Sequence, residues 1–194
     1  MSNEQEQLTV RRLADFAEVE RLYRERLKKD FARNELRPLA NLRRSWEKDA
    51  YDCYSLVDGD EILGYAFFAR LGNNFLFDYF AVAEGHRDEG LGSLFLRCLA
   101  ARLRDADCVV VEVEDPDRAK EAAEREIRER RLQFYLRAGY CETGLTSVLF
   151  GAEYRILEVP AKRAHTTDEL REIYTALCRS VLSPAAFRTQ FRVS

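Results

Sequence analysis

Residues 86–95, HRDEGLGSLF, combine an arginine with two glycines at the start of a helix-like segment. Glycine lowers helix propensity, so its use here indicates that another group approaches the backbone closely. A strand, a glycine-containing turn and a helix together present free backbone N–H groups and the positive end of a helix dipole, which favour an anion such as phosphate. The spacing of Arg87, Gly90 and Gly92 is not the dinucleotide fingerprint, because Phe95 takes the place of the third glycine, and it is not a P-loop, which needs Gly-Lys-Ser/Thr. The alternative is that the glycines only form a tight turn.

Two carboxylates lie in the otherwise apolar segment CVVVEVEDP, residues 108–116. Glu112 and Glu114 are two residues apart, so in a strand they share one face of the sheet. An apolar strand should not direct carboxylates inward without a purpose, because burying an unpaired charge is costly. With Asp78 on a neighbouring strand, they could form an anionic pocket for a cationic amine. The alternative is that both glutamates lie at the exposed end of the strand and are simply solvated.

An acid can come from Tyr135 in RRLQFYLRAGY, residues 130–140, since a phenol with a pKa of about 10 stays protonated at neutral pH. The alternative for Tyr135 is a core aromatic of its helix. The two histidines, His86 and His165, are expected in a loop and in a helix-start segment, and we do not assign either as the base.

Hydrophobic periodicity predicts the elements that position these residues. Helices are expected at about 15–31, 39–48, 91–103, 116–138 and 170–182. Strands are expected at 8–13, three times within 51–82, and at 108–116, 141–150 and 153–161. The strands on either side of the helix at 91–103 should be parallel, because a helical crossover joins them.

Composition sets broad limits on the function. The chain has 194 residues and is expected to form one domain, and its net charge of −3 argues against a nucleic-acid binder. The basic stretch 24–44 is either a solvated face or a rim that attracts an acidic group. Five scattered cysteines with no C-x-x-C pair predict reduced, buried thiols in a cytoplasmic protein, without disulfides or a metal site. No apolar run approaches membrane-spanning length and the first residues are polar, so no membrane segment or signal peptide is expected.

The sequence resembles the GNAT superfamily of acyl-CoA-dependent N-acyltransferases. Two segments carry the resemblance: FDYFAVAEGHRDEGLGSLFLRCL at 77–99, with its R-x-x-G-x-G pattern, and RRLQFYLRAGY at 130–140. The resemblance implies a mixed α/β fold in which a mostly antiparallel, twisted sheet has helices on both faces and one parallel, splayed strand pair at the acyl-CoA site. It implies a single domain over 1–194, with a common core at about 8–160 and a C-terminal helical extension at about 161–194.

The family resemblance also implies roles for individual residues. The coenzyme-binding backbone comprises Phe80, Ala81 and Val82 beside the pantetheine arm, and Arg87, Asp88, Glu89, Gly90, Leu91, Gly92 and Ser93 around the pyrophosphate. Tyr135 matches the family tyrosine that protonates the coenzyme thiolate, and Glu112 aligns with the glutamate that serves as base in ribosomal-protein acetyltransferases. Asp78 and Glu114 are assigned to substrate binding. The sequence departs from the family at Arg128, where the family often has asparagine. The segment between Glu112 and Tyr135 is also longer than in the common pattern, which affects the Glu112 assignment more than coenzyme binding.

The implied activity is transfer of an acetyl group from acetyl-CoA, as co-substrate, to a primary amine by direct attack. The alternative is a sensor or assembly protein that binds acyl-CoA without turnover. No metal, nucleic acid or membrane is expected to take part, and the identity of the amine, the acyl chain length and a homodimeric state stay open.

Overall fold

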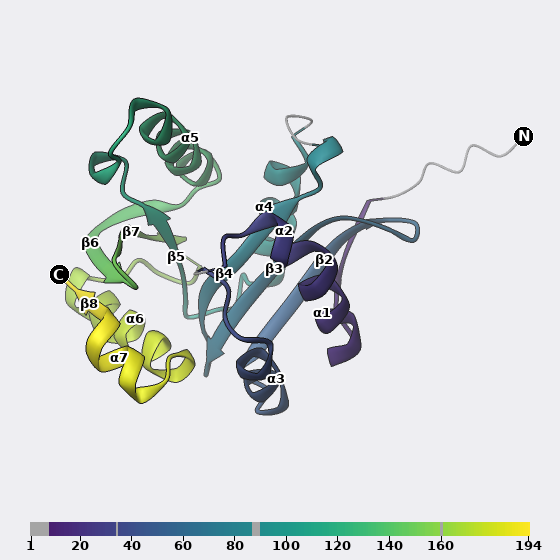
Figure 1. The fold of residues 1–194 in the computed structure, drawn as a ribbon, viewed down its shortest axis with the longest axis horizontal. Coiled ribbons are helices and arrows are strands. Elements are labelled where there is room, and N and C mark those ends of the chain that lie inside the picture. Colours follow the sequence, from purple (N-terminus) through teal and green to yellow (C-terminus); the bar gives the residue numbers. More distant parts are fainter. Residues whose placement is uncertain (1–7, 34, 87–89, 160) are drawn as a thin grey trace, which may run out of the picture. The chain divides into compact units, whose positions relative to one another are not determined.

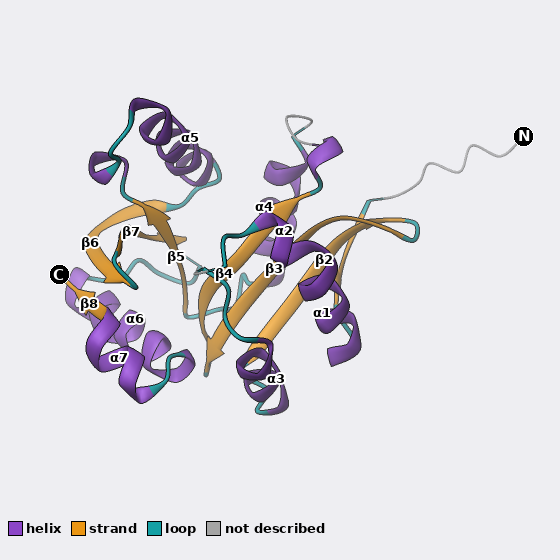
Figure 2. Ribbon diagram, viewed as in Figure 1, coloured by secondary structure: helices purple, strands orange, loops and turns teal. Residues whose placement is uncertain are grey.

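A computed structural model of the chain describes residues 8–33, 35–86, 90–159 and 161–194. The chain divides into two compact units, one formed by Met1–Phe68 with Tyr79–Ala101 and the other by Ala69–Asp78 with Arg102–Ser194. Hydrogen bonding along the strands follows the order β1-β2-β3-β4-β5-β7-β6-β8. Both units contain helices and strands (Figures 1 and 2). The expected mixed α/β fold with a largely antiparallel sheet is confirmed.

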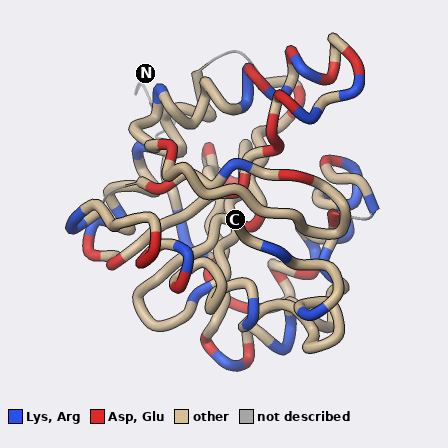
Figure 3. Tube along the Cα trace, turned by 90° about the vertical axis from the view of Figure 1, so that its left-hand side faces the viewer, with Lys and Arg blue, Asp and Glu red and all other residues tan. Residues whose placement is uncertain are grey.

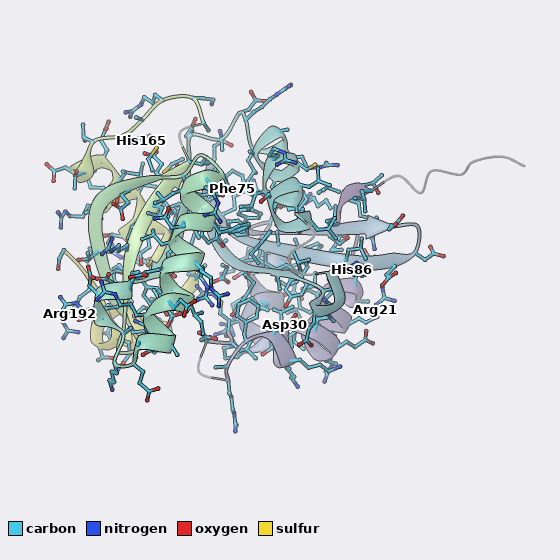
Figure 4. The ribbon with its side chains drawn as sticks, turned by 90° about the horizontal axis from the view of Figure 1, so that it is seen from above. Arg21, Asp30, Phe75, His86, His165 and Arg192 are labelled. Carbon is cyan, nitrogen blue, oxygen red and sulfur yellow. The ribbon has the colours of Figure 1, made fainter. Side chains whose placement is uncertain are left out.

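The first unit is built on antiparallel strands. β1 (Thr9–Arg12) pairs with β2 (Tyr51–Asp58), from Thr9↔Val57 to Arg12↔Tyr54. This unit also holds most of β3 (Glu61–Leu71) and the end of β4 (Asn74–Val82). Helices α1 (Phe16–Leu22) and α3 (Leu39–Glu47) lie on one face of these strands and α4 (Leu91–Arg102) lies on the other (Figures 1 and 4). Both faces of β2 and β3 are therefore buried, which explains their nearly continuous apolar sequences.

The first predicted helix, 15–31, is interrupted. α1 leads into a π-helical turn, η1 (Tyr23–Leu27), and then into α2 (Lys28–Asp30). The wider turn lets Leu22 and Tyr23, which are consecutive in the sequence, both be buried together with Leu27. The chain is nevertheless helical throughout Phe16–Asp30, so the helix predicted at about 15–31 is confirmed, with a π-helical segment inside it.

The second unit contains the predicted parallel pair. β4 and β5 (Cys108–Glu114) run parallel, with a register from Asn74↔Cys108 to Phe77↔Val111, before either strand ends. The other pairings in this unit are antiparallel: β5 with β7 (Ala152–Val159), β7 with β6 (Cys141–Leu149), and β6 with β8 (Phe191–Val193).

Three helices complete the second unit. α5 (Ala122–Arg137) packs against β5, α6 (Thr167–Val181) packs against β6, and α7 (Pro184–Gln190) lies beside β8. α5 and α6 cover opposite faces of the strands (Figure 1). β5 is buried along most of its length, and Val110 of β5, Leu157 of β7 and Tyr174 of α6 have no exposed surface.

Three predictions need correction. The helix expected from 116 begins at Ala122, because Asp115 caps a separate 3-10 turn, η3 (Pro116–Arg118), and accepts from the Asp117 N–H. α7 and β8 were not predicted. Cys53, Cys108 and Cys178 are buried free thiols as expected, whereas Cys98 is half-buried and Cys141 is exposed.

Within the described ranges, the structure contains no helix that is both long and apolar enough to cross a membrane.

Candidate active site

Glu112 is the first residue of β5 beyond its register with β4, and it lies opposite Ile156 of β7. Its side chain is half-buried and accepts a hydrogen bond from the Tyr174 hydroxyl of α6. The Ser147 hydroxyl of β6 lies 2.9 Å from the same phenolic oxygen. A phenol has one proton, and because it is donated to the carboxylate, the Ser147 hydroxyl is the donor to Tyr174.

The Tyr174 hydroxyl is held in its protonated form. The side chain has no exposed surface. Burial, and then the negative charge of Glu112, raise the pKa of Tyr174 well above that of a free phenol. Tyr174 therefore acts as a fixed donor to the Glu112 carboxylate.

Glu114 has different partners from Glu112. Its carboxylate lies 3.2 Å from Arg128 Nη2 and 2.8 Å from Arg131 Nη1, both on α5. Glu112 and Glu114 lie two residues apart on β5, but Glu112 is contacted from α6 and Glu114 from α5. The expected anionic pocket shared by both glutamates is therefore not what these contacts form, because two guanidinium groups already compensate Glu114.

Arg128, which departs from the family pattern, fastens α5 to the end of β5. Its Nη1 donates to the Asp115 carbonyl at 2.9 Å, and its Nη2 also lies 2.7 Å from Glu124. Basic and acidic residues are interspersed along the trace in Figure 3. On α5 these charges form local ion pairs, such as Arg125 with Glu129 at 2.8 Å. The charged sequence of this helix thus serves mainly its own solvent-facing surface and its junction with β5.

Tyr135 lies on the buried face of α5. Its ring packs edge-on against Phe77 at 6.2 Å, Phe134 at 5.3 Å and Tyr140 at 5.2 Å between centroids. Burial raises the pKa of Tyr135 well above its ordinary value. The phenol therefore keeps its proton at neutral pH, as a general acid must, but the same contacts are those of a core aromatic.

Asp78 is a half-buried residue of β4, directly after the last pair of the parallel register, Phe77↔Val111. It belongs to the same unit as Glu112, Glu114 and Tyr135. The next residues of β4, Phe80, Ala81 and Val82, belong to the first unit and are all half-buried.

The glycine loop begins α4 in the first unit. Gly90 has φ +79°, a left-handed conformation that other residues rarely adopt, and its carbonyl accepts from the Leu94 N–H at 3.0 Å. Leu91, Gly92 and Ser93 form the first turn, whose N–H groups have no partner within the helix. Glycine at position 90 is thus required by the backbone itself, and the first turn retains donors for an anion. Arg87, Asp88 and Glu89 lie outside the described residues.

Phe95 packs the start of α4 against the strands. Its ring lies 5.5 Å from that of Phe80, and a Cβ built on Gly64 of β3 would lie 3.3 Å from Phe95 and 3.0 Å from the Ala81 carbonyl. A side chain at 64 would therefore displace the end of β4 or α4. This close packing positions the strand and the helix that together carry the proposed coenzyme-binding backbone.

Sequence reasoning missed Tyr174, which donates to Glu112, and Ser147, which is hydrogen-bonded to the Tyr174 hydroxyl. Tyr174 appeared only as one of the apolar positions of the last helix, and Ser147 gave no signal beyond being a polar residue in a strand. No pattern within either segment indicates the contact, since 62 residues separate Tyr174 from Glu112.

A family model described as "Acetyltransferase (GNAT) family" matches residues 16–140. This range includes the glycine loop, Glu112 and Tyr135, and it ends before Tyr174 and Ser147. No curated protein matches the chain significantly.

Solved structures with the same fold include several acetyltransferases. A Bacteroides thetaiotaomicron protein described as a "Putative acetyltransferase from GNAT family" is 19% identical with a TM-score of 0.68, and the match covers 89% of this chain and 98% of that one. The ribosomal-protein-S18-alanine N-acetyltransferase of Escherichia coli is 15% identical with a TM-score of 0.58, covering 82% and 97%. A Bacillus subtilis acetyltransferase in complex with CoA is 14% identical with a TM-score of 0.53, covering 79% and 98%. At these identities the likeness shows the fold.

Proposed function

Because the chain belongs to the acetyltransferase (GNAT) family, we propose that it transfers an acetyl group from acetyl-CoA to a primary amine of a small molecule or protein. The observation that carries the proposal is the position of the Glu112 carboxylate. Glu112 lies on β5 within the family-matched range, and it accepts a hydrogen bond from the buried Tyr174 hydroxyl of α6. A carboxylate that a fixed hydrogen-bond donor holds in one orientation can act as a general base and accept the proton of an amine.

The proposed reaction is direct attack. Glu112 accepts a proton from the ammonium group, directly or through one water, because an amine with a pKa of about 10.4 is otherwise protonated at neutral pH. The amine nitrogen then bonds to the acetyl carbon, and the carbon–sulfur bond of the thioester breaks. Tyr135 donates its phenolic proton to the departing thiolate, and the acylated nitrogen gives up its second proton to the Tyr135 phenolate, directly or through water, so that the amide and the free thiol are both neutral. The raised pKa of Tyr135 keeps its proton in place until the thiolate forms.

Coenzyme binding is proposed for the backbone at the start of α4. The pyrophosphate would be held by N–H groups of residues 87–93, where the helix dipole and free donors favour negative charge. Support comes from the left-handed φ of Gly90 directly before the first turn of α4, whose N–H groups have no acceptor within the helix. The backbone of Phe80, Ala81 and Val82 is proposed to pair with the pantetheine arm.

The acceptor is proposed to be cationic, with Asp78 near its path. Glu114 remains a weaker candidate for acceptor binding than Asp78, because Arg128 and Arg131 already compensate its charge.

The proposal is tested by release of free thiol from acetyl-CoA with a panel of amines: antibiotics, polyamines, amino acids and protein N-termini. Glu112→Gln should lower kcat/KM by about 10²- to 10⁴-fold with the best acceptor, most strongly at low pH where free amine is scarce. Glu114→Gln is the matched control on the same strand and should retain most activity. Full activity in Glu112→Gln, with loss in Asp78→Asn or Glu114→Gln, would show that another carboxylate is the base. Coenzyme binding without turnover of any amine would favour the non-catalytic acyl-CoA binder instead.

A further inference from the structure

Three side chains with different metal-binding atoms meet inside the second unit. Cys108, Glu158 and His165 place one sulfur, one oxygen and one nitrogen within 4.8 Å of one another. Cys108 has no exposed surface and the side chains of Glu158 and His165 are 5% and 4% exposed, so this is not a group of solvated surface acids. It is the one such group of three found among the described residues.

The fold brings these residues together from three segments. Cys108 begins β5, and Glu158 is the second-last residue of β7, the antiparallel neighbour of β5. The register Val110↔Glu158 puts Glu158 diagonally across from Cys108 on one face of the sheet. His165 directly precedes Thr166, whose capping box with Glu169 fixes the start of α6, and His165 is labelled in Figure 4.

The spacing of the atoms fits a zinc-like ion. With Zn–S near 2.3 Å and Zn–O near 2.1 Å, a tetrahedral site places sulfur and oxygen about 3.6 Å apart. Cys108 Sγ lies 3.7 Å from Glu158 Oε1. His165 Nδ1 is in hydrogen-bond contact with the same oxygen, so these two atoms would separate to about 3.4 Å around an ion. The His165 backbone N–H, 3.4 Å from Glu158 Oε2, would help to hold the carboxylate as an outer partner.

Charge favours a divalent ion over a monovalent one. A thiolate and a carboxylate carry two negative charges and a neutral imidazole carries none, so a divalent cation leaves no net charge in the buried site. The nearby Arg163 is engaged by Glu169 at 2.7 Å and so does not serve as the partner of this cluster. A sulfur ligand selects against Mg²⁺ and Ca²⁺.

We propose that Cys108, Glu158 and His165 bind one zinc-like divalent ion, with the fourth tetrahedral position taken by water. The ion would link the start of β5, the end of β7 and the start of α6. β5 carries Glu112 and α6 carries Tyr174, but the ion site is independent of the acetyl-transfer proposal. The sequence predicted no metal because its cysteines form no pair, and this site needs only one cysteine.

The test uses untagged, full-length protein treated with a chelator, desalted and titrated with Co²⁺ as a spectroscopic probe and with Zn²⁺ as competitor. The expected result is one ion per chain, a sulfur-to-cobalt charge-transfer band that Zn²⁺ removes, and a higher Tm with Zn²⁺. Cys108→Ser should abolish the band. It should also weaken Zn²⁺ binding by more than the roughly 10- to 100-fold lost with an outer-shell partner. His165→Gln, which keeps a hydrogen-bonding group beside Glu158, should likewise weaken binding.

Cys141→Ser is the matched control, because it removes an exposed cysteine of the same unit. It should leave the band and the Tm shift intact. Absence of a charge-transfer band in folded parent protein, or loss of the band in Cys141→Ser with retention in Cys108→Ser, would overturn the proposal. In that case the cluster is a hydrogen-bonded group only. Circular dichroism of each variant separates loss of the ion from loss of the fold.

Discussion

Replacing Tyr174 with phenylalanine tests whether α6 positions the proposed base. The substitution removes one hydroxyl and leaves the ring, which has no exposed surface. The centroid of this ring lies 5.6 Å from the centroid of the Phe191 ring. Glu112 loses its buried donor and Ser147 loses its acceptor. No cavity larger than an oxygen atom forms, so the effect comes from the hydrogen bonds and not from packing.

The size of the effect follows from those two bonds. A hydrogen bond to a charged group contributes about 1.5–3 kcal/mol and a neutral one about 1 kcal/mol. Water can partly replace the donor at half-buried Glu112, so we expect the free energy of unfolding to fall by about 1–3 kcal/mol. The same reasoning gives a fall in kcat of about 10-fold, below the 10²- to 10⁴-fold expected when the base itself is removed. Tyr174 thus acts as a positioning residue and not as a reacting group.

The pH dependence of kcat/KM separates positioning from simple destabilisation. The Tyr174 bond favours the ionised carboxylate, so its loss should move the acidic limb of the profile to higher pH. In a Glu112→Gln background, Tyr174→Phe should have little further effect on turnover, because the two residues act as one unit. The matched control is Tyr65→Phe, which removes a 2.7 Å bond from another fully buried tyrosine to Asp30 in the first unit. It should reduce stability without moving the limb. A folded Tyr174→Phe protein with unchanged kcat and an unchanged acidic limb would refute the reasoning.

Three further predictions concern the acid, the coenzyme loop and the start of α6. Tyr135→Phe should lower kcat without raising KM, because the phenolic proton is needed only in the transition state. It should barely change Tm, because the ring contacts remain. Steady-state kinetics measures the effect, and an unchanged kcat would make Tyr135 a core aromatic. Gly92→Val should weaken CoA binding by about 10-fold or more, which corresponds to the loss of one charged hydrogen bond, while the circular dichroism spectrum stays unchanged. Calorimetry measures the affinity, and equal affinity for CoA in parent and variant would show that the glycine loop does not bind the coenzyme. The Arg163 hydrogen bond, and then the Thr166 N–H, lower the pKa of Glu169 from 4.5 to about 2. The stabilisation from Glu169 is therefore fully present above pH 4.5 and is lost as the pH falls toward 2, so the Tm difference between parent and Glu169→Gln should be small, positive at pH 7 and absent near pH 2.

Several features of this protein were determined by the sequence alone, because they depend on residues close together in the chain. Alternating and helical apolar patterns predicted most strands and helices, since each pattern reflects the local geometry of one element. The glycine loop was recognisable because backbone conformation and free N–H groups at a helix start are local properties. The parallel pairing of the strands around α4 also followed, because a helical crossover permits no antiparallel return.

The tertiary structure decided which polar side chains face one another. Alternation placed Glu112 and Glu114 on one face, yet Glu112 is bound by Tyr174 and Glu114 by Arg128 and Arg131. The meeting of Cys108, Glu158 and His165 depends in the same way on strand register and on where α6 begins. The physical reason is that a hydrogen bond or a metal site requires atoms within a few ångströms of one another, and only the packed chain brings residues 50 or more positions apart to that distance.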